Sequence, residues 1–247
     1  MKRLFYDIEV SPNYGSFWRP GRKLTIDYRS IKKERAVICI GYKWEEDREA
    51  TVLSWDRSQC DKKMLKTFST ILASADECVG HNIDRFDLPW VRTRCLIHKL
   101  QSFPPPRTCD TLKWARKLGF NSNRLDYLGQ VLGIGCKIKT DHGLWDAVCW
   151  DDDRKALAQM MEYCANDVLL LQAVYGELSE LFPPKTHVGV MFNHERWSCP
   201  YCGSDNVIKN RPRVSAKGVK SQQMKCKDCK RYYEISDKLR EQYEYAA

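Results

Sequence analysis

Near its start the chain reads LFYDIEV at residues 4–10, and this stretch alternates as a β-strand does. Its apolar face carries Leu4, Tyr6, Ile8 and Val10. Asp7 and Glu9 leave the strand on the opposite face. An apolar strand rarely carries two such carboxylates unless cations neutralise them, although an exposed face of an edge strand produces the same pattern. The stretch therefore predicts either a metal-binding strand or an edge strand.

The pattern around this strand predicts an α/β domain. β-rich runs at 36–44 and 50–55 predict a hairpin, and a short apolar run at 78–81 predicts another buried strand. Helical spacing of apolar residues predicts helices at 61–74, 87–98, 110–118, 125–132 and 153–181. Together these segments predict one mixed β-sheet covered by helices.

Two further motifs place polar side chains where predicted elements begin or pack. HNIDRFD at 81–87 follows a predicted strand and places Asp87 at a helix N-terminus, where a carboxylate also stabilises the helix by a few tenths of a kcal/mol. YCAND at 163–167 lies within the long helix, with Tyr163 and Asp167 on adjacent turns. Each motif alone also fits an ordinary helix. The three together favour a shared acidic site.

FYDIEV, HNIDRFD and YCAND resemble, in this order, the three exonuclease motifs of the DEDD superfamily. The third motif carries a tyrosine, Tyr163, and in this it resembles the tyrosine subclass of the superfamily, DEDDy. VGHNIDRFDLPW, at residues 79–90, is especially similar to the proofreading exonuclease domain of family B DNA polymerases. The resemblance covers residues 1–182 and implies an RNase H-like fold of the DnaQ-like exonuclease type.

The resemblance implies a metal-dependent 3′→5′ exonuclease that hydrolyses DNA from the 3′ end to nucleoside monophosphates. Asp7, Glu9, Asp87 and Asp167 would balance two divalent cations, and hard oxygen ligands favour Mg²⁺ or Mn²⁺. By resemblance Asp7 bridges the two metals. Glu9 and Asp167 hold the one that activates water, and Asp87 holds the other.

The remaining residues of this site are expected to handle water and substrate. Tyr163 has an ordinary pKa near 10, so it orients water better than it removes a proton. The resemblance makes Asn82 a substrate-positioning residue. Phe5, Phe86 and the segment 137–142 are candidates to meet bases or backbone, although core packing is the expected fate of the two phenylalanines.

Two Cys-x-x-Cys pairs near the C-terminus predict a structural zinc site. The pairs are Cys199 with Cys202 and Cys226 with Cys229, and four thiolates are a set that zinc prefers. The surrounding sequence resembles the zinc ribbons of transposases and other nucleic-acid proteins. We expect an exonuclease domain at 1–182, a linker at 183–197 and a zinc ribbon with a short tail at 198–247.

Positive charge points to a polyanionic partner. The chain has a net charge of +9, and residues 199–247 contain 11 Lys and Arg against 6 Asp and Glu. The expected nucleic-acid contacts of the ribbon are Lys209, Arg211, Arg213, Lys217 and Lys220. The alternative for the ribbon is docking to a replication or recombination protein, because zinc ribbons serve both uses.

Composition excludes several other classes. With 43% hydrophobic and 30% charged residues the chain is not largely disordered, and no apolar run is long enough to span a membrane. We expect a cytoplasmic protein without a secretory signal, and a chain of this length leaves no room for a polymerase domain. The domain organisation resembles that of nucleases of phages and mobile elements. Two alternatives stay open: an exoribonuclease that trims RNA from the 3′ end as RNase D does, and a non-catalytic nucleic-acid-binding adaptor.

Overall fold

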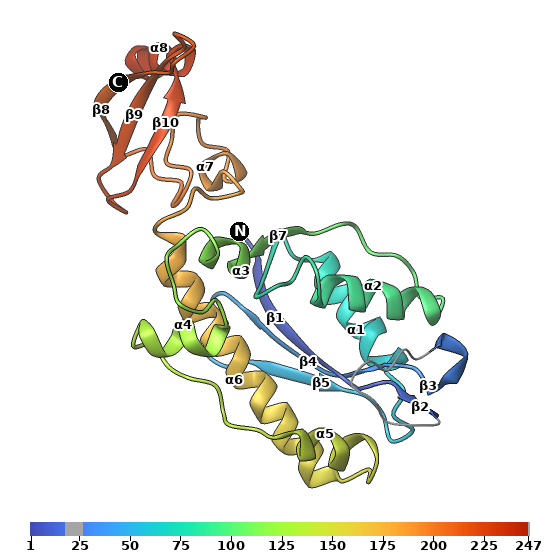
Figure 1. Ribbon diagram of the computed structural model, residues 1–247. Helices are drawn as coiled ribbons and strands as arrows, with labels where there is room; N and C mark the ends of the chain where they lie inside the picture. The colour runs from blue at the N-terminus through green and yellow to red at the C-terminus, as the bar shows by residue number, and fades with distance from the viewer. Residues whose placement is uncertain (18–26, 247) are drawn as a thin grey trace. The chain divides into compact units, whose positions relative to one another are not determined.

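The computed structural model describes residues 1–17 and 27–246 of the 247-residue chain (Figure 1). These residues form two compact units, which divide between Tyr175 and Gly176. The division falls inside the long helix α6 (Arg154–Ser179). Each unit has its own hydrophobic core.

The first unit is built on a five-stranded mixed sheet. Its strands are β1 (Arg3–Val10), β4 (Val37–Trp44), β5 (Thr51–Ser54), β6 (Glu77–Gly80) and β7 (Arg107–Asp110). Their order is β5-β4-β1-β6-β7, with β1 antiparallel to β4 and parallel to β6. β1 therefore lies at the centre of the sheet, which excludes the edge-strand explanation of Asp7 and Glu9.

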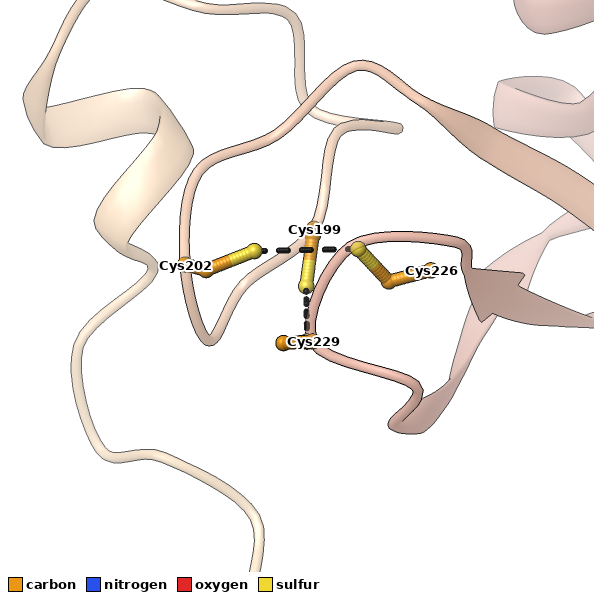
Figure 2. A group of neighbouring side chains, drawn as sticks. All are labelled: Cys199, Cys202, Cys226 and Cys229. Atoms are coloured by element: carbon orange, nitrogen blue, oxygen red, sulfur yellow. Dashed lines mark hydrogen bonds between the residues drawn. The ribbon is translucent and has the colours of Figure 1, made fainter.

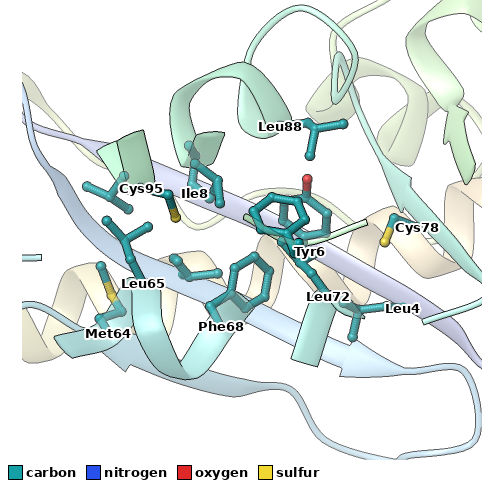
Figure 3. Packing of buried hydrophobic residues seen from close by; sticks show 14 of the residues in the cluster. Leu4, Tyr6, Ile8, Met64, Leu65, Phe68, Leu72, Cys78, Leu88 and Cys95 are labelled. Atoms are coloured by element: carbon teal, nitrogen blue, oxygen red, sulfur yellow. The ribbon is translucent and has the colours of Figure 1, made fainter. Parts of the chain in front are cut away.

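Helices cover both faces of this sheet (Figure 1). On one face α1 (Lys62–Ala73) and α2 (Asp87–Ile97) pack against the apolar face of β1, and Figure 3 shows Tyr6 beside Phe68 of α1 with ring centroids 5.1 Å apart. On the other face lie α5 (His142–Cys149) and α6. The predicted mixed sheet flanked by helices is confirmed.

A close approach at Gly41 brings α6 onto the sheet. Gly41 lies opposite Asp7 in the β1–β4 register, and a Cβ atom there would lie 2.9 Å from the carbonyl oxygen of Cys164. The Gly41 amide donates to Cys164 Sγ at 3.2 Å, and the thiol donates to the Asp7 carbonyl oxygen at 3.6 Å. Because Asp167 follows Cys164 by almost one turn, this contact places Asp167 beside Asp7.

The region between α2 and α6 differs from the sequence-based expectation. Residues 110–118 were predicted as one helix, but Asp110 ends strand β7 and caps the shorter α3 (Thr111–Ala115), accepting from the Leu112 amide at 3.0 Å. The helix α4 (Leu125–Val131) lies where expected. Nearer the N-terminus, before α1, small elements that the pattern did not predict are β2 (Tyr14–Gly15), the 3₁₀ turn η1 (Tyr28–Ser30) and β3 (Ile31–Lys33). These elements are too short to produce a detectable period.

The second unit is a small ribbon. Three antiparallel strands, β8 (Val207–Val214), β9 (Lys220–Cys226) and β10 (Tyr232–Ser236), are arranged in the order β10-β9-β8. The short helix α7 (Val188–Met191) precedes them and α8 (Asp237–Ala246) follows them. Met224 and Ile235 are buried beneath Leu239 and Tyr243 of α8. This mini-core is small, so a further stabilising element is required.

Within the described ranges 1–17 and 27–246, no helix combines the length and apolar character needed to cross a bilayer.

Candidate active site and metal centres

Three carboxylates converge on the face of the central sheet that α6 covers. Asp7 and Glu9 come from β1 and Asp167 comes from α6, and one oxygen of each lies within 4.8 Å of the others. The strand period places Asp7 and Glu9 on this face, and the Gly41–Cys164 contact brings the helix to them. Asp167 is fully buried.

Asp87 lies next to these three carboxylates without joining the group. It is the first residue of α2 and is 1% exposed. Its Oδ1 atom accepts the backbone N–H of Ile8 at 3.2 Å, and Ile8 lies between Asp7 and Glu9 on β1. The fourth carboxylate is thus anchored to the strand that carries the first two.

Burial raises the pKa values of all four carboxyl groups, and repulsion by neighbouring carboxylates adds to the rise for Asp7, Glu9 and Asp87. Burial and the Asp167 charge raise the pKa of Asp7 to about 7. The pKa of Glu9 lies well above its usual value because of burial and the charges of Asp7 and Asp167, and that of Asp87 is raised by burial and by Asp7. Such a cluster is costly unless a cation neutralises it.

Lys137 supplies a positive charge to the cluster. It lies between α4 and α5, and its Nζ atom donates to Asp167 Oδ2 and, at 3.0 Å, to the hydroxyl of Tyr163. Burial alone would lower the pKa of Lys137, but Asp167 and Asp7 raise it above its ordinary value. The segment 137–142 was expected to meet bases or backbone, whereas Lys137 lies among the carboxylates. A lone lysine in a loop has no periodic signal that could have singled it out.

The donor set fits a hard divalent cation. Asp167 Oδ1 is buried without a hydrogen-bond partner among the described residues, although its sister oxygen is paired with Lys137. A buried carboxylate oxygen without a partner is costly. Oxygen ligands from Asp7, Glu9 and Asp167 are those that Mg²⁺ or Mn²⁺ takes.

The other predicted site residues lie around this cluster in different environments. Burial raises the pKa of Tyr163 above its usual value, so its hydroxyl keeps its proton. Asn82 lies between β6 and α2 with a φ of 77°, and its backbone N–H donates to Asp110 Oδ1 at 3.0 Å. Phe86 is half-buried against the core, and Phe5 is fully buried edge-on to Tyr175. The expectation of core packing is confirmed for Phe5.

The four ribbon cysteines form a second candidate metal centre. Their sulfur atoms lie within 4.8 Å of one another, with 3.6 Å between Cys199 and Cys229 and 3.7 Å between Cys202 and Cys226 (Figure 2). A tetrahedral zinc ion with bonds of about 2.3 Å separates its sulfurs by about 3.8 Å. Gly203 closes the first knuckle with a φ of 80°, its amide donating to Cys199 O at 2.9 Å. The predicted Cys₄ cluster of a small zinc ribbon is confirmed.

The ribbon cations that were expected to contact nucleic acid lie on different surfaces. The register shifts between Lys209 and Arg211, a β-bulge that leaves Asn210 unpaired. Lys209 forms an ion pair with Glu244 of α8 at 2.7 Å, whereas the Arg211 guanidinium donates to Gln223 at 3.2 Å. Lys217 lies in the exposed turn between β8 and β9, and Lys220 is the exposed first residue of β9.

Comparison with known proteins gives the class. A sequence profile of the RNase H superfamily matches residues 30–179, which is more than half of the chain, and the chain belongs to this superfamily. The fold described above is the nuclease fold of that class.

Solved structures agree with this assignment. The family B DNA polymerase from the hyperthermophilic archaeon Pyrobaculum calidifontis is similar to the chain, with a TM-score of 0.57 and 17% identity. The similarity covers 72% of this chain and 24% of the polymerase chain, so the chain spans about a quarter of that protein. At this identity the likeness shows a shared fold. No curated protein matches the chain.

Proposed function

We propose that the chain is a metal-dependent 3′→5′ exonuclease that hydrolyses DNA from the 3′ end and releases nucleoside monophosphates. The observation that carries the proposal is the convergence of Asp7, Glu9 and Asp167, with the buried Asp167 Oδ1 lacking a hydrogen-bond partner among the described residues. Membership of the RNase H superfamily and the fold shared with a DNA polymerase support the choice of substrate.

The side chains divide by role. Asp7, Glu9 and Asp167, whose oxygens lie close together, would hold one divalent cation, and Asp87, anchored on the backbone of β1, would join Asp7 in holding a second. Two such cations, when bound, activate water and stabilise the leaving 3′ oxygen. The protonated Tyr163 hydroxyl orients the water, and Lys137 holds that hydroxyl. Asn82 and Phe86 meet the end of the substrate strand. In the ribbon, the clustered Cys199, Cys202, Cys226 and Cys229 would hold one structural Zn²⁺.

The test measures the degradation of a 5′-labelled DNA oligonucleotide and of its RNA counterpart by zinc-saturated protein, with and without added Mg²⁺ or Mn²⁺. We expect a metal-dependent ladder that shortens DNA from the 3′ end. A ladder on RNA alone would favour the exoribonuclease. Binding without cleavage of either strand would contradict the exonuclease proposal and favour the adaptor.

Two matched variants connect the activity to the site. Asp7→Ala removes a central carboxylate, and we expect cleavage to fall to background. Asp84→Ala removes an acidic side chain of the same motif region that pairs instead with Lys113 at 2.6 Å, and we expect full activity. Cleavage retained in Asp7→Ala would move the catalytic site elsewhere.

A further inference from the structure

The three-stranded sheet of the ribbon has one covered and one open face. Residues directly opposite each other on neighbouring strands share a face. The row that contains Met224 and Tyr233 and the row that contains Gln222 and Ile235 face α8, and Met224 is fully buried. The rows that contain Lys225, Gln223 and Ser221 face away from α8.

Cations and one aromatic ring gather on the face turned away from α8, which we call the open face. Its three rows are Ile208–Lys225–Tyr232, Arg211–Gln223–Glu234 and Arg213–Ser221–Ser236. The β-bulge at Asn210 produces this grouping, because it turns Arg211 and Arg213 away from the face on which Lys209 pairs with α8. The face carries three cations against one carboxylate, Glu234, which lies 3.8 Å from Arg213.

Tyr232 is arranged to receive a flat ligand. Its side chain is 46% exposed, whereas the neighbouring Tyr233 is partly buried and donates its hydroxyl proton to the Trp197 carbonyl oxygen at 2.6 Å. The ammonium of Lys225 lies 5.4 Å from the centroid of the Tyr232 ring. An exposed aromatic ring beside a cation is the combination that stacks a base and neutralises its phosphate.

We propose that the open face of the ribbon binds single-stranded nucleic acid, with Tyr232 stacking on a base and Lys225, Arg211 and Arg213 meeting phosphates. Single strands fit better than duplex because their base faces are free to stack. The positive charge and the small apolar area, contributed by Ile208 and Tyr232, favour a polyanion over a protein partner. The inference rests on the proposed function in that the bound strand is the substrate of the nuclease.

The experiment measures binding and cleavage separately on the full chain. Binding is followed by fluorescence anisotropy with a labelled deoxythymidine oligomer of about 16 nucleotides, in zinc-saturated, Mg²⁺-free buffer over a salt series. Tyr232→Ala should weaken binding about tenfold, and Tyr232→Phe should restore it, because stacking uses the ring. Lys225→Ala should reduce the slope of log K against log salt by about 0.7.

Matched controls lie on α8. Tyr245→Ala removes an aromatic side chain that is 96% exposed, and Lys238→Ala removes an exposed cation. We expect both to bind as the unmodified chain does. Zinc content confirms that every variant keeps its ribbon. Unchanged binding in both Tyr232→Ala and Lys225→Ala, or an equal loss in the controls, overturns the proposal and favours a protein on this face.

Cleavage of a trinucleotide with Mg²⁺ is the separate readout, because so short a strand does not need the ribbon. We expect all four alanine variants to cleave it at the unmodified rate. Loss of oligomer binding with normal trinucleotide cleavage supports both proposals. Binding that depends on Tyr232 in a protein that cleaves nothing supports the open face and contradicts the exonuclease.

Discussion

Replacing Asp7 by asparagine should stabilise the metal-free protein, although the same change should abolish the proposed activity. Asp7 lies in a cluster of carboxylates whose pKa values are all raised. In the absence of a divalent cation, the charged form of Asp7 is repelled by Asp167 and disfavoured by burial. Asparagine keeps the shape and removes the charge.

The pKa of Asp7 gives the size of the effect. A rise from 3.8 to about 7 corresponds to about 4 kcal/mol of destabilisation at pH 8. Partial exposure of the residue screens the repulsion, so we expect Asp7→Asn to raise the free energy of unfolding by about 2–4 kcal/mol at that pH. Because the folded-state pKa is the higher one, the cost accumulates as pH rises from about 4 to about 7, and the gain should shrink to about 2 kcal/mol or less at pH 5.

The assay is urea unfolding of zinc-saturated protein followed by tryptophan fluorescence. Seven of the eight tryptophans precede residue 176, so the signal reports chiefly on the first unit. Mg²⁺ should stabilise the unmodified chain at pH 8, and it should stabilise the Asp7→Asn variant much less. A variant that is no more stable than the unmodified chain at pH 8, or a gain that is independent of pH, refutes the reasoning.

The remaining predictions concern three other charged or metal-binding groups. Lys137→Met should destabilise the metal-free protein by about 3 kcal/mol, because it leaves Asp167 buried and unpaired. Mg²⁺ should restore most of the lost stability. If Mg²⁺ does not stabilise the variant in urea unfolding, the result contradicts a cation site at Asp167. Cys202→Ser should release zinc and unfold the ribbon strands β8, β9 and β10, seen as lost amide dispersion in NMR spectra, and leave tryptophan unfolding of the first unit unchanged. Burial alone would raise the pKa of Asp61, but hydrogen bonds from Arg94 and from the Val37 amide lower it. Asp61→Asn should therefore lower the free energy of unfolding by about 3–5 kcal/mol at neutral pH. This difference should shrink at low pH, where the carboxyl of the unmodified chain becomes protonated. An equal loss of stability at pH 7 and pH 3 would be incompatible with a charge effect.

Much of the fold could be predicted because it depends on contiguous residues. The alternation of residues 4–10 specifies which side chains share a face of β1, and the observed strand preserves it. The apolar stripe of α6 and the paired cysteines are equally local signals. Residues 110–118 were misassigned as a single helix because Asp110 ends a buried strand and caps the helix that follows, and sequence patterns locate such boundaries poorly.

The candidate site was only partly predictable. The sequence pattern indicated Asp7, Glu9, Asp87 and Asp167, and the structure brings three of them together with Asp87 beside them. Lys137 was missed as a member of the cluster, because it lies in a loop 26 residues before Tyr163 and enters the site only through tertiary packing.

The sequence by itself determined that Asp7 and Glu9 share a face, that four cysteines form a set suited to one metal ion, and that the charge of the ribbon is positive. Each of these properties follows from residue type and a short period. Only the tertiary structure decided that β1 is central, that α6 reaches the sheet at Gly41, and that a bulge at Asn210 directs Arg211 and Arg213 to the open face. These features depend on contacts between segments far apart in the chain, and the strength of such contacts is set by packing and register rather than by local pattern.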